Sequence, residues 1–124
     1  MIEAHLLGRS VTSNSSEAFG LHKKSHFGEP QGEKIQYSLP EALFLAEKGK
    51  LSILSRGKKI LLRDLMKKFS SSDKRLNIKY PVFKDLREKG FVVKTALKFG
   101  ADFRVYDKGS SPGDKHARWV VFAD

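Results

Sequence analysis

The chain has 124 residues, of which 40% are hydrophobic and 31% are charged, a composition typical of one folded domain or two very small ones. It contains no cysteine, which excludes disulfides, thiolate metal sites and cysteine nucleophiles and suits a reducing cytoplasm. Its apolar runs, such as "ALFLA" and "WVVFA", are too short to cross a bilayer.

Positive charge is the strongest signal in the composition. Twenty-four Lys and Arg residues against 14 Asp and Glu residues give a net charge of +10 and an isoelectric point near 9.9. Because each phosphate contact releases condensed counterions, this balance favours a nucleic acid as partner. An anionic membrane is a weaker alternative, since no basic amphipathic helix with a clean apolar face stands out.

The first third of the chain predicts short elements. A strand is expected near residues 5–7, a helix over 16–24, and a loop or hairpin turn at "HFGEPQGEK". The stretch "SLPEALFLAEKGK" predicts a helix, because Ser38 and Glu41 have capping-box spacing and Gly49 provides a stop. Its buried stripe is expected to comprise Leu39, Ala42, Leu43 and Ala46, widened by Phe44 or Leu45.

The middle of the chain predicts a strand "LSILS", a turn "RGKK" and a helix "ILLRDLMKKF" that ends at the serines 70–72. Asp73 can cap the next helix, which runs to Gly90, and Pro81 should kink it or split it. A domain boundary fits best near Ser70 to Asp73, which divides the chain into residues 1–72 and 73–124. The core side of the second helix is expected to comprise Leu76, Tyr80, Phe83 and Leu86.

After Gly90 the apolar period changes from helical to two. The stretches "FVVKTALKF" and "ADFRVYD" predict paired strands, and "HARWVVFAD" predicts a third, central strand with Trp119 in the core. Asp102 stands inside a strand and is expected to pair with a nearby Lys or Arg. The helix before them carries charges expected on a solvated, salt-bridged face, namely Asp85, Arg87 and Glu88.

Histidines occur early in the chain without a carboxylate pattern around them. His5, His22 and His26 are therefore expected at the surface rather than around a metal ion. A fourth histidine, His116, lies across a Gly, Ser and Pro loop from Tyr106 in "GADFRVYDKGSSPGDKH". This loop is either an ordinary solvated connection or a device that brings two strand ends together.

The stretch "YPVFKDLREKGFVVKTALKFGADFRVYDKGSSPGDKHARWVV" resembles the C-terminal catalytic domain of archaeal tRNA-splicing endonucleases. The upstream stretch "HFGEPQGEKIQYSLPEALFLAEKGKLSIL" looks like the N-terminal domain of the same family. The resemblance implies an α+β chain, with a small helical and antiparallel N-terminal domain followed by part of an α/β nuclease domain with a mixed sheet.

The family cuts introns from precursor tRNA at a bulge-helix-bulge without metal or other cofactor, leaving 2′,3′-cyclic phosphate and 5′-hydroxyl ends. Its catalytic tyrosine and histidine correspond to Tyr106 and His116, and its catalytic lysine falls after Asp124. A histidine suits either proton-transfer role, whereas a free tyrosine, with a pKa near 10, needs cations beside it. Arg104, Lys108 and Lys115 are the candidate cations and RNA contacts. The sequence leaves open which group is base and which is acid.

Two functions fit this pattern. The chain is an endonuclease subunit whose lysine comes from a partner or from a segment after Asp124, or it is a non-catalytic, RNA-binding subunit of the same assembly. Both imply a homo-oligomer or hetero-oligomer with another endonuclease subunit, a precursor tRNA as RNA partner, and no membrane. A basic nucleic-acid-binding module unrelated to splicing is the third alternative.

Overall fold

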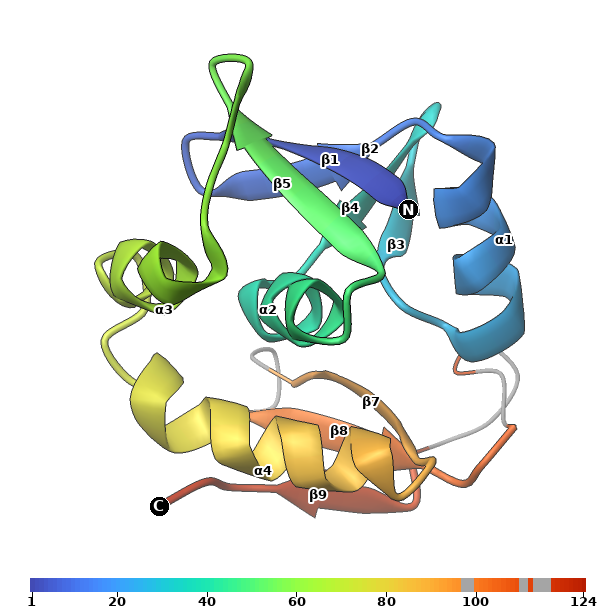
Figure 1. Cartoon of the computed structure of the whole chain (residues 1–124). Coiled ribbons are helices and arrows are strands. Elements are labelled where there is room, and N and C mark those ends of the chain that lie inside the picture. Colours follow the sequence, from blue (N-terminus) through green and yellow to red (C-terminus); the bar gives the residue numbers. More distant parts are fainter. Residues whose placement is uncertain (97–99, 110–111, 113–116) are drawn as a thin grey trace. The chain divides into compact units, whose positions relative to one another are not determined.

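A computed structural model describes the chain except residues 97–99, 110–111 and 113–116 (Figure 1). The chain is α+β, as the sequence predicts, and its described residues form four helices and two sheets. It divides into two compact units, Met1–Leu76 and Asn77–Asp124, close to the serine-rich stretch at residues 70–73.

The N-terminal unit contains a mixed six-stranded sheet in the order β3-β4-β2-β1-β5-β6. Neighbouring strands are antiparallel except β1 and β5, which are parallel and pair from Ile2 with Leu51 to His5 with Leu54. The sequence analysis expects an antiparallel N-terminal domain. The parallel pair corrects this expectation, and no local pattern reveals it, because β1 and β5 lie far apart in the chain. The strand bounds are β1 Ile2–Leu7, β2 Ser10–Ser13, β3 Glu29–Gln31, β4 Lys34–Tyr37, β5 Leu51–Ser55 and β6 Lys58–Lys59.

Three helices accompany this sheet, and the central one is enclosed on more than one side. Helix α2 packs against both β5 and α3, and Phe44 of α2 stacks on Phe27 at 5.7 Å between ring centroids. Every residue from Pro40 to Leu45 is therefore buried, whereas Leu39 and Ala46 are half-buried, so the one-sided stripe that the sequence predicts is too narrow. The helix bounds are α1 Ser16–Ser25, α2 Leu39–Glu47 and α3 Leu62–Ser70.

The predicted capping box at the start of α2 is present and extends further than expected. The Ser38 hydroxyl accepts from the Glu41 amide at 3.3 Å, and Glu41 Oε1 accepts from the Ser38 amide at 3.0 Å. Glu41 is only 3% exposed, and its second oxygen, Oε2, accepts from the Gly28 amide at 2.8 Å. One carboxylate thus closes the helix start and holds the segment between α1 and β3.

Gly28 stands where the backbone requires a glycine. Its φ is +78°, which other residues rarely adopt, and a Cβ there would clash with Ile35 Cγ2 and lie 3.1 Å from both Gln36 O and Tyr37 Cδ1. The close approach of this segment to β4 is what brings the Gly28 amide within reach of Glu41.

Replacing Glu41 by Gln removes the acceptor for the Gly28 amide, since an amide nitrogen cannot accept, while leaving an oxygen for Ser38. We expect Glu41→Gln to lower the free energy of unfolding by about 2 kcal/mol, and Ser38→Ala by about 1 kcal/mol. Urea unfolding measures both losses. Equal losses for the two variants would contradict the structural role of the Gly28 bond.

Tyr37 gives a prediction for alkaline pH. Burial, followed by the charge of Glu41, raises the pKa of Tyr37 to about 12, whereas an unfolded tyrosine titrates near 10.0. Between pH 10 and 12 the unfolded state releases a proton that the folded state keeps, so stability present below pH 10 is lost as the pH rises. The loss is roughly 2–3 kcal/mol for two pH units.

Tyr37→Phe tests this effect. The Tyr37 hydroxyl is buried and accepts or donates no hydrogen bond among the described residues, so its removal at pH 8 should be neutral or slightly stabilising. Urea unfolding at pH 8 and pH 11 should show the wild type losing more stability than the variant. The same pH dependence in both proteins would refute the raised pKa.

The C-terminal unit combines helix α4 with a three-stranded antiparallel sheet in the order β7-β8-β9. Before α4, the Asp73 carboxylate accepts from the Arg75 amide at 3.0 Å, in line with the predicted cap. The helix continues through Pro81, so Pro81 does not split it. Bounds are α4 Leu76–Glu88, β7 Val92–Thr95, β8 Phe103–Tyr106 and β9 Trp119–Val121.

Three expectations for this unit need correction. Strand β9 lies at the edge of the sheet formed by the described residues, and Trp119 is 43% exposed rather than in the core. Its ring meets Phe91 edge to face at 5.5 Å. Arg87 is only 9% exposed, because its guanidinium lies over the Phe83 ring and donates to Val93 O at 3.4 Å. The mixed sheet of this chain is the one in the N-terminal unit, whereas the described strands of the C-terminal unit are all antiparallel.

Candidate active site

Strand β8 sets the direction of Tyr106. Successive side chains of a strand point to opposite faces, so Phe103 and Val105 share one face, and Arg104 and Tyr106 share the other. Phe103 packs against Phe83 of α4 at 5.7 Å between centroids, which assigns the first face to the helix. Tyr106 therefore belongs to the face that is turned away from α4.

Arg104 is held beside Tyr106. Its Nε donates to the Thr95 carbonyl on β7 at 2.8 Å, and its guanidinium carbon lies 5.9 Å from the centroid of the Tyr106 ring. Tyr106 itself is 3% exposed. The arrangement puts a fixed positive charge within the range of a cation–π contact with the candidate catalytic tyrosine.

Lys108 has a different environment. Its ammonium lies 5.7 Å from the Phe91 ring centroid, and its methylene groups pass close to Gly90, where an added Cβ would lie 3.3 Å from Cδ and Cε. The side chain of Lys108 thus lies against the turn between α4 and β7. Lys115 and His116 lie outside the described residues, so the structure brings together only Tyr106 and Arg104 of the five predicted site residues.

Polar links join β8 to β9 at both ends of their pairing. Asp107 and Arg118 form an ion pair at 2.8 Å, and the Arg118 amide donates to Val105 O at 2.9 Å. Asp102, which is 6% exposed, accepts from the Ala123 amide at 2.8 Å. The expected pairing of Asp102 with a Lys or Arg stays a prediction. The bond to the Ala123 amide was not predictable, because it joins residues 21 positions apart.

No three His, Asp or Glu side chains within the described residues gather in a way that would hold a metal ion. His22 Nδ1 instead lies 3.0 Å from the carbonyl oxygen of Gly28. None of the helices in the described part of the chain is long and apolar enough to span a bilayer.

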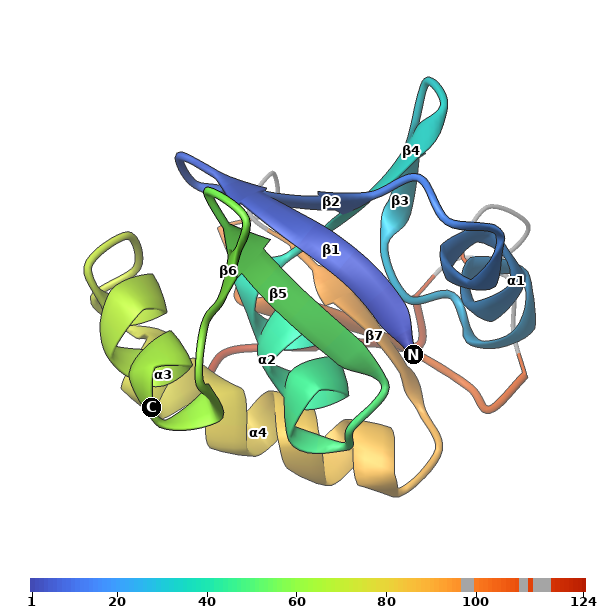
Figure 2. The same cartoon turned by 45° about the horizontal axis from the view of Figure 1, so that its top comes forward.

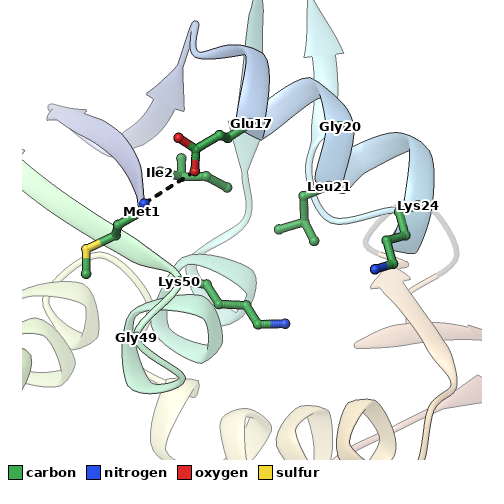
Figure 3. A pocket seen from close by; sticks show the side chains of 8 residues that line it. All are labelled: Met1, Ile2, Glu17, Gly20, Leu21, Lys24, Gly49 and Lys50. Atoms are coloured by element: carbon green, nitrogen blue, oxygen red, sulfur yellow. Dashed lines mark ion pairs between the residues drawn. The ribbon is translucent and has the colours of Figure 1, made fainter.

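A cavity of about 450 Å³ in the N-terminal unit is lined by none of the predicted site residues (Figure 3). The N-terminal ammonium of Met1 lies 3.3 Å from Glu17 Oε2 at its edge, and no histidine or tyrosine lines it. It therefore lacks the tyrosine and histidine pair of the predicted site. The lining residues are Met1, Ile2, Glu17, Gly20, Leu21, Lys24, Gly49 and Lys50.

Comparison with known proteins matches both units. The family described as tRNA intron endonuclease, N-terminal domain, matches residues 2–66, and the family described as tRNA intron endonuclease, catalytic C-terminal domain, matches residues 76–124. Proteins named tRNA-splicing endonuclease are similar over almost the whole chain. The one from Pyrococcus horikoshii is 40% identical over 122 residues, which is 98% of this chain and 69% of that protein.

Two further relatives carry the same name. The protein from Thermococcus onnurineus is 39% identical over 98% of this chain and 70% of its own length, and the one from Methanothermobacter thermautotrophicus is 36% identical over 97% and 70%. The chain thus has the architecture of a two-domain RNA-processing nuclease. It belongs to the tRNA intron endonuclease family.

The Asp102 bond gives a stability prediction. Asp102→Ala leaves the buried Ala123 amide without its acceptor, and we expect a loss of about 1–3 kcal/mol in the free energy of unfolding. Asp107→Ala removes an exposed ion pair and should cost less than about 1 kcal/mol. Urea unfolding of the two variants compares them, and a larger loss for Asp107→Ala would contradict the importance of the buried carboxylate.

Proposed function

We propose that this chain supplies Tyr106 and His116 to an active site that cuts precursor tRNA at the bulge-helix-bulge by attack of a ribose 2′-hydroxyl. The observation that carries the proposal is the placement of Arg104 beside Tyr106 on one face of β8. Membership of the tRNA intron endonuclease family supports the substrate, because the relatives are named for tRNA splicing.

The reaction needs two proton transfers and one stabilising charge. A base removes the 2′-hydroxyl proton while the 2′ oxygen bonds to the adjacent phosphorus, and an acid protonates the 5′ oxygen as its bond to phosphorus breaks. The products are a 2′,3′-cyclic phosphate and a 5′-hydroxyl. Positive charge stabilises the five-coordinate phosphorus between these steps. The chemistry is complete without a metal ion.

Tyr106 and His116 are the groups in this chain that suit the proton transfers. Following the family's usual assignment, Tyr106 is the base and His116 the acid. Arg104 is held next to Tyr106 by its bond to Thr95 O, so its positive charge is fixed on the same face of β8 and can stabilise negative charge that develops there during the reaction.

The loop ends support the placement of His116 near the same site. Asp107 directly follows β8 and pairs with Arg118, which directly precedes β9. His116 comes two residues before Arg118, so the covalent length of the chain keeps its Cα within about 7 Å of that ion-paired end. We propose that His116 acts together with Tyr106 in the active site.

The proposal extends to the remaining cations and to the assembly. Lys108 and Lys115 contact RNA phosphates near the cut, and Arg104 contributes positive charge from its position beside Tyr106. The family's catalytic lysine, which falls after Asp124 by resemblance, stabilises the phosphorus. The working enzyme is an oligomer with a second endonuclease subunit of the same kind.

Cleavage of an end-labelled bulge-helix-bulge RNA in excess EDTA tests the proposal, with the protein in its natural assembly. We expect cuts at both bulges, and losses of about 10²- to 10⁴-fold for Tyr106→Phe and His116→Ala. Tyr80→Phe and His5→Ala are matched controls that remove the same groups elsewhere, and they should retain activity.

Two results would contradict the catalytic role. Full activity in Tyr106→Phe and His116→Ala would show that other residues transfer the protons. Tight RNA binding with no cleavage by the wild-type assembly would make the chain a non-catalytic, RNA-binding subunit.

A further inference from the structure

Most of the excess charge lies outside the unit that carries Tyr106. Residues 1–76 hold 14 of the 24 Lys and Arg residues and eight of the 14 Asp and Glu residues, so this unit carries six of the chain's ten net positive charges. Residues 56–68 alone hold six cations and a single acid, Asp64. The proposed active site uses none of these cations.

The sheet topology gathers cations at one end of the N-terminal unit. Because β1 and β5 are parallel and in register, their carboxyl ends lie at the same end of the sheet. Arg9 lies in the turn after β1, and Arg56 lies in the turn after β5, followed by Lys58 and Lys59 on β6. Figures 1 and 2 both show these two turns and α3 at the same end of the unit, on the side away from α1.

Helix α3 adds two more cations to this end. Leu65 and Phe69 are buried and mark its inner face. Arg63 and Lys67 are exposed, and helical spacing places both on the opposite, outer face. We call the six exposed cations the basic end of the unit: Arg9, Arg56, Lys58, Lys59, Arg63 and Lys67.

These six cations have no carboxylate partners within the part of the chain that the structure describes. Elsewhere the chain does pair its charges, as in Lys89 with Asp85 at 2.9 Å and Arg118 with Asp107 at 2.8 Å. The basic end thus presents an unneutralised positive surface.

Two of the cations stand where local structure disfavours them. Arg56 has a φ of +52°, in the left-handed region that favours Asn or Gly in such a two-residue hairpin turn. Arg63 lies in the first turn of α3, where the helix dipole repels positive charge, and it lies four residues from Lys67, which repels it as well. Folding does not explain Arg56 or Arg63, whereas a polyanionic ligand explains both.

We propose that the basic end binds the phosphate backbone of a double-stranded arm of the RNA substrate, apart from the nucleotides that are cut. This inference rests on the proposed function for the identity of the RNA. Evenly spaced phosphates suit cations spread over two turns and a helix. Leu7, Leu61 and Leu62 are exposed at the same end, so an anionic membrane is the competing ligand, and the vesicle experiment below tests it.

Arg56→Asn, Arg63→Gln and Lys67→Gln together test the proposal. Arg56→Asn and Arg63→Gln remove charges from positions that disfavour them, which offsets the small loss from removing Lys67 in the last turn of α3, so the triple variant should be about as stable as the wild type. Binding is measured with a bulge-helix-bulge RNA that carries full double-stranded arms, at several salt concentrations. We expect about tenfold or weaker binding and a slope of log Kd against log salt that is lower by about two to three.

The matched control removes three exposed cations elsewhere in the same unit, in the variant Lys23→Gln, Lys24→Gln, Lys34→Gln. This control should bind nearly as tightly as the wild type. An RNA with trimmed arms should reduce the difference between the two triple variants. Equal loss of RNA affinity in both triple variants would overturn the proposal, because it would show that binding depends on the net charge of the unit and not on the basic end.

The other outcomes separate this proposal from the proposed function and from other partners. If the wild type cuts no RNA but only the basic-end variant loses affinity for double-stranded RNA, the surface stands and the proposed function falls. The proposal is overturned if the basic-end variant keeps its affinity for RNA. Lost binding to phosphatidylserine vesicles would then indicate a membrane as the ligand. A changed oligomeric mass in sedimentation would instead indicate an acidic protein surface.

Discussion

The alternation of strand β8 is the constraint on which the C-terminal unit depends. Among the described strands of this unit it alone is paired on both edges, and the packing of Phe103 against Phe83 fixes which face meets α4. Arg104 and Tyr106 are thereby committed to the other face. A slip of one residue would exchange the two sets of side chains, so the hydrophobic packing of one residue determines the direction of the candidate base.

In each unit a buried carboxylate accepts a hydrogen bond from a backbone amide that is distant in the sequence. Glu41 accepts from the Gly28 amide and Asp102 accepts from the Ala123 amide, in each case across a long stretch of sequence. The positive exterior has a different origin, because Lys and Arg outnumber Asp and Glu by 24 to 14 in the chain. The basic end of the N-terminal unit gathers six of these cations, and a polyanionic substrate fits such a surface.

Local patterns carried the predictions that the structure confirms. The capping box predicted α2 because Ser38 and Glu41 are neighbours in sequence, and apolar alternation predicted β7 and β8. Predictions failed where distant contacts decide. The parallel pairing of β1 with β5, the burial of Arg87 over Phe83 and the exposure of Trp119 all depend on partners that no local pattern reveals. Of the candidate site, the sequence named Tyr106 and three candidate cations but did not single out Arg104 as the one beside Tyr106, and the placement of His116 stays a prediction.

In the proposed mechanism the substrate's own 2′-hydroxyl is the nucleophile, with Tyr106 as its base. The most direct test is a bulge-helix-bulge RNA with a single 2′-deoxy substitution at the nucleotide before each cut, offered to the wild-type assembly in EDTA. The account predicts that the substituted RNA binds with nearly unchanged affinity and is not cut, while the unsubstituted RNA yields 2′,3′-cyclic phosphate ends. Cleavage of the deoxy RNA at the same positions would show that water or a protein group attacks, and would contradict the account.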